Sequence, residues 1–207
     1  MIYLVDNTID GEGVSPREIL DALERLRPET PVVMEHFKEV SLGRVRELKP
    51  SHIILSGQSD PWANYTPQSL AGVFEVIHEA EQPVLGICGG HQQIALAFGS
   101  TLGIMKRTAP GNGYEGAVKL RGFYDVETAE GTDIFADLPR RLTVWQSHYE
   151  EVRELPEKFE ITASSDTCRI EAMRHRERPV FSVQFHPELF DEEHPQGKHV
   201  LENFLDL

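Results

Sequence analysis

One cysteine lies in a sequence context that would make it a nucleophile. Residues 84–92 read V-L-G-I-C-G-G-H-Q, so an apolar run leads directly into Cys88 and two glycines follow it. This pattern is typical of a nucleophile elbow, the sharp strand-to-helix turn that exposes a reactive side chain. Gly86 and Gly90 lie two residues either side of Cys88, where a Cβ atom would clash in so tight a turn. The helix that follows would favour the thiolate, and the N–H group of Gly89 could stabilise an oxyanion.

A cysteine nucleophile needs a general base and usually a third group that orients the base. Residues 181–188 read F-S-V-Q-F-H-P-E, and the apolar run 180–183 predicts a strand that ends just before His186. Glu188 lies two residues after His186, so both side chains can point the same way, and Pro187 stiffens the link. Glu188 could then bond one ring nitrogen and leave the other for Cys88. Taken alone, the glycine-rich turn could also hold an ordinary buried cysteine, and the downstream histidine and glutamate favour the nucleophile.

The remaining cysteine and histidines offer weaker candidates. Cys168 is 80 positions from Cys88 and sits in a strand-like run, so we expect a small buried side chain there. Two cysteines in a chain of this size do not make a disulfide framework. Of the nine histidines only His186 has the setting described above, and we assign His91, inside the elbow helix, a structural role. No residue is assigned to a metal, and no organic cofactor is expected.

The elements that would position these residues change character halfway along the chain. In the first half, apolar runs at 2–5, 31–34, 52–55 and 83–87 alternate with helical patterns at 15–26, 41–48, 66–80 and 92–98. Ser15 is a plausible N-cap for the first helix, with Pro16 at the first helical position and Glu18 completing a capping box. Strands that alternate with helices predict βαβ units and a parallel sheet covered on both faces.

The second half reads mostly as short strands, with one final helix. Strand-like runs occur at 118–120, 142–144, 159–161, 168–173 and 180–183, and a helix is predicted at about 197–205. We therefore predict an α/β fold: an open, mostly parallel sheet with helices on both faces, a flavodoxin-like core, and an antiparallel elaboration in the second half. One late strand should return to the main sheet. The whole chain, residues 1–207, is predicted to form a single domain.

Composition excludes several functional classes. The chain has 207 residues, of which 40% are hydrophobic and 26% charged, and its formal net charge is −14. An acidic surface repels phosphate backbones, so we expect no nucleic-acid partner. No apolar run approaches the roughly 20 residues needed to span a bilayer, so we expect no membrane partner. The first residues lack the basic and apolar regions of a secretory signal, and a cytoplasmic location is therefore expected.

These motifs resemble those of the class I, triad-type glutamine amidotransferases. G-I-C-G-G-H-Q at 86–92 is similar to the family's nucleophile motif, and F-H-P-E at 185–188 is similar to its histidine–glutamate motif. The resemblance implies that Cys88, His186 and Glu188 form a catalytic triad that hydrolyses the side-chain amide of L-glutamine through a cysteinyl thioester. It further implies that Gln92, Ser147, His148 and Tyr149 hold the substrate. The ammonia would pass to a synthase partner on another polypeptide, because this chain is too short to carry a second catalytic domain.

The loop after the third predicted strand departs from the family pattern. The family usually has two adjacent glycines there, but this chain reads S-G-Q-S-D-P-W, with Gln58 in place of the second glycine. The resemblance assigns the second oxyanion N–H to Gly57 or Gln58, with the Gln58 side chain beside the substrate. Whether a loop with this sequence can stabilise an oxyanion without a partner protein stays open.

Three alternatives stay open at this stage. Residues 144–148 and 194–204 look most like the branch of the family that serves GMP synthetase, although the first 60 residues follow no particular branch. The same triad could instead belong to a γ-glutamyl hydrolase or peptidase that acts on larger substrates. A catalytically silent subunit that only binds glutamine is the third possibility.

Overall fold

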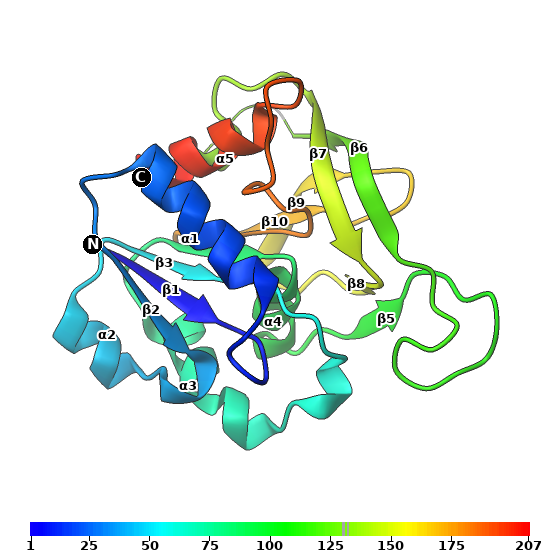
Figure 1. The fold of residues 1–207 in the computed structure, drawn as a ribbon, viewed down its shortest axis with the longest axis horizontal. Coiled ribbons are helices and arrows are strands. Elements are labelled where there is room, and N and C mark those ends of the chain that lie inside the picture. The colour runs from blue at the N-terminus through cyan, green and yellow to red at the C-terminus, as the bar shows by residue number, and fades with distance from the viewer. Residues whose placement is uncertain (130, 132) are drawn as a thin grey trace.

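The computed structural model describes residues 1–129, 131 and 133–207. Its main feature is a nine-stranded sheet with the order β2-β1-β3-β4-β11-β10-β9-β6-β7 (Figure 1). The strands are β1 (Ile2–Asp6), β2 (Val32–His36), β3 (His52–Leu55), β4 (Val84–Ile87), β6 (Leu120–Thr128), β7 (Arg141–His148), β9 (Phe159–Ser164), β10 (Ala172–His175) and β11 (Val180–Val183). A separate pair, β5 (Leu102–Ile104) and β8 (Glu150–Val152), lies beside it.

The predicted change of character is visible in the strand directions. The neighbours among β2, β1, β3, β4 and β11 all pair in parallel. From β11 through β10, β9 and β6 to β7, every pair is antiparallel. The late strand that returns to the main sheet is β11, which pairs with β4 in register from Val180↔Val84 to Val183↔Ile87. This pairing brings the residues after β4 and those after β11 to the same edge of the sheet.

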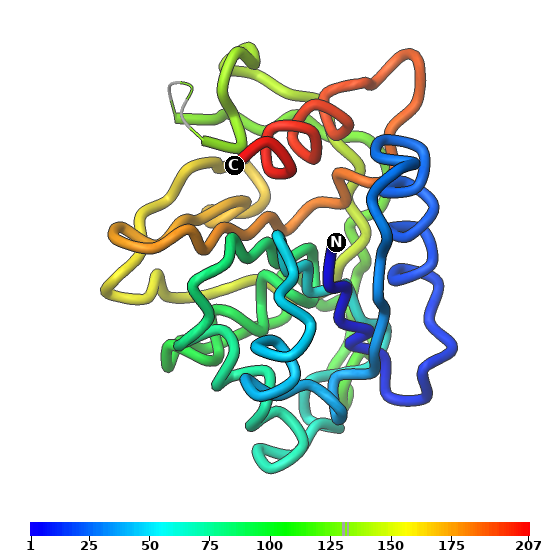
Figure 2. The backbone as a smooth tube through the Cα atoms, turned by 90° about the vertical axis from the view of Figure 1, so that its left-hand side faces the viewer, coloured from blue at the N-terminus to red at the C-terminus, as the bar shows by residue number. Residues whose placement is uncertain are grey.

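Helices cover both faces of the parallel part, as predicted. The helices are α1 (Val14–Leu26), α2 (Leu42–Leu48), α3 (Pro67–Glu79), α4 (Gly89–Ala97) and α5 (Gln196–Leu205). On one face, α1 and α5 pack against one set of alternate strand residues, such as Leu4 and Ile54. On the other, α2, α3 and α4 pack against the opposite set, such as Val5 and Ile53. Figure 2 shows α1 (blue) and α3–α4 (green) on opposite sides of the sheet.

Several local predictions were wrong. Ser15 does not cap α1, because the N-cap is Gly13 and makes no side-chain bond; Ser15 lies inside the helix and accepts a bond from elsewhere. The strand predicted at 168–173 begins only at Ala172, since Cys168 lies in a turn where its N–H donates to Ser165 Oγ. The strand predicted at 118–120 is also wrong, because residues 118 and 119 lie outside any strand and Leu120 is the first residue of the longer β6. The burial expected for Cys168 is confirmed.

No helix within the described residues is long and apolar enough to cross a bilayer. The single-domain organisation of residues 1–207 stays a prediction.

Candidate active site

The turn at Cys88 has the strained geometry that the elbow motif predicts. Cys88 has φ 51° and ψ −101°, and it is the residue immediately before α4. A Cβ on Gly86 would lie 2.4 Å from the Gly90 carbonyl oxygen, and one on Gly90 would lie 2.2 Å from the Leu55 carbonyl oxygen. Real Cβ contacts are essentially never so short, so both positions require glycine. The close approach of α4 to β3 and β4 therefore forces the cysteine into a positive-φ conformation that the surrounding structure must support.

His186 and Glu188 meet at the end of β11 as the sequence predicts. The Glu188 Oε1 atom lies 2.7 Å from His186 Nδ1, and both side chains are buried. The backbone N–H of His186 donates to the Trp145 carbonyl at 2.8 Å, which fixes the ring's position against β7. Among the described residues, Nε2 bonds no nitrogen or oxygen atom, and it faces the Cys88 sulfur. The Cys88 sulfur, the His186 ring and the Glu188 carboxylate thus lie next to one another, as a triad would require.

The charges at this site favour a protonated imidazole. Burial alone would lower the pKa of His186, but attraction to Glu188 and to the Cys88 sulfur raises this pKa well above its usual 6.5. These attractions favour the protonated form of the His186 ring, whose Nδ1 is bonded to the Glu188 carboxylate. An imidazolium in this position can act as a general acid. It can protonate the leaving group on the carbon atom that the sulfur attacks.

The loop after β3 provides the second side of the site. The Gly57 N–H donates to Ser15 Oγ at 3.2 Å and is therefore engaged within the protein. The Gln58 N–H finds no protein acceptor among the described residues, and a Cβ on Gly89 would lie only 2.8 Å from Gln58 N. The backbone of Gln58 therefore packs directly against Gly89, the residue after Cys88. Of the two donors that the sequence left open, Gly57 and Gln58, only the Gln58 N–H is without a protein acceptor among the described residues, so the geometry favours Gln58 as the candidate.

Hydrogen bonds from two other segments hold this loop in place, one of them supported by a third. Asn7 binds Ser56 twice, through its backbone N–H to Oγ at 3.0 Å and its Nδ2 to the carbonyl at 2.8 Å. Tyr65 Oη donates to the Asn7 carbonyl at 2.6 Å, and Ser56 Oγ donates to the Gly57 carbonyl at 2.9 Å. Together with the bond from Gly57 to Ser15, these contacts fix the conformation of residues 56 and 57. The loop is preorganised despite its unusual sequence.

A pocket of about 760 Å³ opens in front of Cys88. It is lined by all five residues predicted to hold the substrate, namely Gln58, Gln92, Ser147, His148 and Tyr149. His148 is buried, and its Nδ1 lies 2.9 Å from the Glu150 carbonyl. Burial lowers the pKa of His148 to about 4, so the ring is neutral, with Nδ1 as the donor. The Ser147 carbonyl lies 4.0 Å from the Cys88 sulfur.

Gln92 differs from the other predicted substrate contacts. Its Oε1 accepts a bond from Trp62 Nε1 at 2.7 Å, and its Nε2 donates to the Glu150 carbonyl at 2.9 Å and to Gln184 Oε1 at 3.1 Å. The side chain borders the pocket, yet all its polar atoms are already bonded within the protein. This placement fits a residue that positions its neighbours in the pocket wall and does not bind the substrate itself.

Sequence reasoning missed several residues of the site. Tyr114 comes from the long segment between β5 and β6 that projects from the molecule in Figure 1. Its ring stacks on Tyr149 at 4.5 Å, and its hydroxyl donates to Glu150 Oε2 at 2.8 Å, which closes one wall of the pocket. Nothing in its local sequence indicated this. Gln184 did carry a signal, since it is a polar residue directly after β11 and two residues before His186.

Comparisons with known proteins agree with this site. The family model described as "Glutamine amidotransferase class-I" matches residues 9–207. The chain is 40% identical over 207 residues to a glutamine-hydrolysing GMP synthase subunit of Pyrococcus furiosus, covering 100% of this chain and 98% of that one. The protein of the same name from Thermococcus kodakarensis gives the same identity and coverage.

The structural relatives point the same way. A crystal structure described as that of a putative GMP synthase subunit from Thermoplasma acidophilum has a TM-score of 0.79 at 29% identity, over 99% of this chain and 92% of that one. A glutamine amidotransferase from Thermotoga maritima has a TM-score of 0.69 at 20% identity, over 99% and 82%, and shares the fold. By its sequence match over residues 9–207 and its full-length relatives, this chain belongs to the class-I glutamine amidotransferase family.

Proposed function

We propose that this chain is the glutamine-hydrolysing subunit of a GMP synthase, and that a separate synthase subunit consumes the ammonia. The observation that carries the hydrolytic part is the contact of Cys88, His186 and Glu188 beside two free backbone N–H groups. The acceptor part is supported by the glutamine-hydrolysing GMP synthase subunits that match the whole chain at 40% identity. L-Glutamine is the proposed substrate, and the cytoplasm the proposed location.

The first half-reaction uses the proton held on His186. The Cys88 thiolate attacks the side-chain carboxamide carbon of glutamine, and the carbonyl oxygen becomes an oxyanion between the N–H groups of Gln58 and Gly89. Each such donor contributes roughly 3–4 kcal/mol to the stability of the transition state. The His186 Nε2 proton passes to the amide nitrogen, the C–N bond breaks, and ammonia leaves. A γ-glutamyl thioester on Cys88 and a neutral imidazole remain.

The second half-reaction restores the enzyme. Neutral His186 removes a proton from water, and the resulting hydroxide attacks the thioester carbon. The C–S bond breaks, glutamate leaves, and the Cys88 thiolate again faces protonated His186. Glu188 stays ionised throughout and stabilises the imidazolium in both halves.

The test of the hydrolytic part compares glutamate release by the wild type and Cys88→Ala. Loss of activity in Cys88→Ala supports the proposal, and activity near that of the wild type contradicts it. The acceptor part is tested by mixing the chain with the synthase subunit of the same organism. Glutamine-dependent GMP formation should require this chain, whereas formation from added ammonia should not. If ammonia-dependent synthesis proceeds and glutamine fails to support it, the acceptor assignment is wrong.

The γ-glutamyl hydrolase alternative is tested in the same assay. The pocket of about 760 Å³ is larger than glutamine needs, so a longer γ-substituent is a sterically reasonable substrate. Faster turnover of a γ-glutamyl peptide than of glutamine would favour this alternative. An electrophilic glutamine analogue separates the silent-subunit alternative, because stoichiometric labelling of Cys88 requires a reactive nucleophile.

A further inference from the structure

A third side chain, besides His186 and Glu188, acts on the nucleophile from the interior of the protein. Gln184 is fully buried at the end of β11, and its Nε2 lies 3.7 Å from the Cys88 sulfur. Its Oε1 lies 3.1 Å from Gln92 Nε2. The sulfur is therefore contacted by the His186 imidazole and by an amide two residues earlier in the chain. The proposed mechanism makes no use of this amide.

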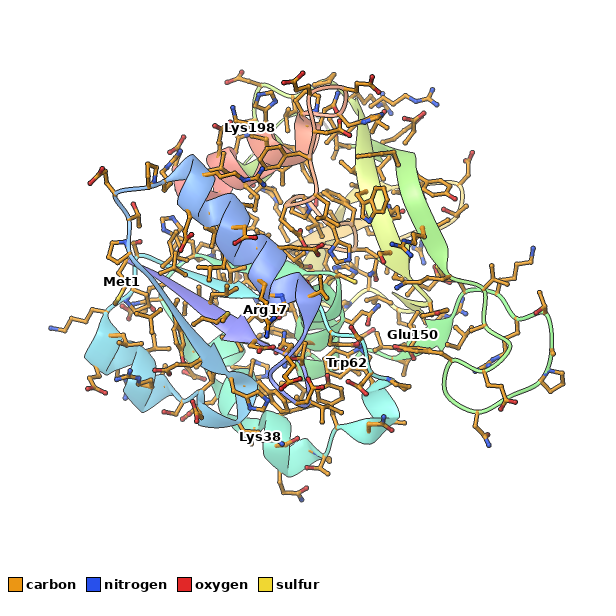
Figure 3. The ribbon with its side chains drawn as sticks, in the orientation of Figure 1. Met1, Arg17, Lys38, Trp62, Glu150 and Lys198 are labelled. Atoms are coloured by element: carbon orange, nitrogen blue, oxygen red, sulfur yellow. The ribbon has the colours of Figure 1, made fainter. Side chains whose placement is uncertain are left out.

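The orientation of the Gln184 amide follows from the chemistry of its neighbours. The Trp62 indole N–H can only donate, so the Gln92 atom that it meets at 2.7 Å must be the oxygen. The Glu150 carbonyl can only accept, so the Gln92 atom that it meets at 2.9 Å must be the nitrogen. Both constraints assign Gln92 in the same way. Figure 3 labels Trp62 and Glu150, which approach Gln92 from separate segments of the chain.

The orientation of the Gln92 amide also determines which atom of Gln184 faces the sulfur. Because Gln92 presents N–H to Gln184, the atom of Gln184 that accepts this bond must be its oxygen. The nitrogen of Gln184 then necessarily faces Cys88, and the sulfur receives an N–H donor. The relay thus runs in one direction from Trp62 through Gln92 and Gln184 to the sulfur.

We propose that Gln184 is a further catalytic residue, which donates an N–H bond to the Cys88 thiolate and whose donor orientation is fixed by Trp62 and the Glu150 carbonyl acting through Gln92. This inference deepens the proposed function and rests on it, since it concerns the same nucleophile. The bond favours the negatively charged sulfur over the thiol, because a thiolate accepts hydrogen bonds far better. It also holds the sulfur at the point where the His186 ring and the two backbone N–H groups converge. Trp62 and Gln92 are positioning residues, since they act through Gln184.

The relay links the nucleophile to the loop that supplies the oxyanion donor. Trp62 lies in the short 3-10 helix Trp62–Asn64, which directly follows residues 56–61 of that loop. A displacement of this loop would remove the indole N–H from Gln92 and leave the Gln92 amide oriented by its bond to the Glu150 carbonyl alone. The orientation of Gln92, and with it the donor that Gln184 presents to the sulfur, would then be less firmly fixed. We therefore expect the loop conformation that presents the oxyanion donor to be the one that also favours the Cys88 thiolate.

The experiment measures the alkylation of Cys88 by iodoacetamide as a function of pH, with the Cys88 peptide followed by mass spectrometry. This readout requires no glutamine and no partner, so it succeeds or fails independently of the glutaminase assignment. Gln184→Met keeps the side-chain length but removes the donor. Trp62→Phe keeps an aromatic ring but removes the indole N–H. Gln93→Leu is the matched control, because Gln93 is a fully buried glutamine on the same helix as Gln92, with no side-chain partner among the described residues.

For Gln184→Met we expect the midpoint of the pH–rate profile to move up by about one pH unit, which corresponds to about tenfold slower alkylation below the midpoint. Trp62→Phe should move it in the same direction by less, and Gln93→Leu should leave it in place. A Gln184→Met midpoint equal to that of the wild type would overturn the proposal. A shift of equal size in Gln93→Leu would do the same, since it would indicate a general packing effect. If Gln184→Met does not fold, the test uses Trp62→Phe, because Trp62 is only half-buried. An unchanged midpoint in Trp62→Phe would then contradict the proposal.

Discussion

Ser15→Ala should reduce catalysis even though Ser15 is absent from the triad. Its hydroxyl accepts the Gly57 N–H at 3.2 Å, and this bond helps hold the loop that presents the Gln58 N–H beside Gly89. A neutral hydrogen bond of this kind contributes about 0.5–1.5 kcal/mol. If that energy is lost only from the preorganised loop, kcat for glutamine hydrolysis should fall by about 2- to 12-fold. The Michaelis constant should change less, because the oxyanion forms only in the transition state.

The matched control for Ser15→Ala is Ser41→Ala. Ser41 Oγ accepts the Arg44 N–H at 3.1 Å as the N-cap of α2, so the same type of bond is lost on a helix outside the pocket. Both variants should lose similar stability in a denaturant titration, whereas only Ser15→Ala should lose kcat. An unchanged or higher kcat in Ser15→Ala would refute the view that this bond positions the oxyanion donor. The assay is glutamate release under saturating glutamine, with and without the synthase partner.

Three further predictions follow from the packing and the charges. Gly90→Ala should destabilise the fold by about 1–3 kcal/mol in chemical denaturation, because its Cβ would lie 2.2 Å from the Leu55 carbonyl oxygen. Glu188→Gln should lower kcat by roughly 10- to 150-fold, since it replaces the charged partner of His186 in a bond worth about 1.5–3 kcal/mol; a kcat within twofold of the wild type would contradict this. Burial raises the pKa of Glu171 from 4.5 to about 7, so its contribution to stability should be fully present below pH 4.5 and lost as pH rises through 7. This loss amounts to about 3 kcal/mol, and thermal unfolding of Glu171→Gln should show a correspondingly flatter pH dependence between these limits.

The reactive turn and its base could be read from the sequence because their signals are local. Gly86 and Gly90 flank Cys88 at a spacing that only a tight turn explains, and the apolar run before His186 places that residue at a strand end. The parallel pairing of β11 with β4 then brings the two motifs together. The triad's convergence thus follows from two strands that are easily recognised as strands.

The rest of the site depends on contacts between distant segments, which leave no local signal. Ser15 looked like a helix cap because serine followed by proline is typical of one, but a loop 42 residues away takes its hydroxyl instead. Tyr114 reaches the pocket from a long irregular segment whose path periodicity cannot predict. The role of Gln92 was taken from the family pattern, whereas its bonds to Trp62 and Gln184 appear only once three segments are folded together.

The membership in the amidotransferase family confirms the enzyme class that the sequence predicted, a cysteine-dependent amidotransferase. The roles assigned to individual residues remain proposals, and the covalent intermediate is their most direct consequence. Intact-mass spectrometry of the chain, acid-quenched during glutamine turnover, measures that intermediate. The account predicts an adduct of the mass of a γ-glutamyl group, located on the Cys88 peptide and absent from Cys88→Ala, which should also release no glutamate. Continued glutamate release by Cys88→Ala, or an adduct on any other residue, would contradict it.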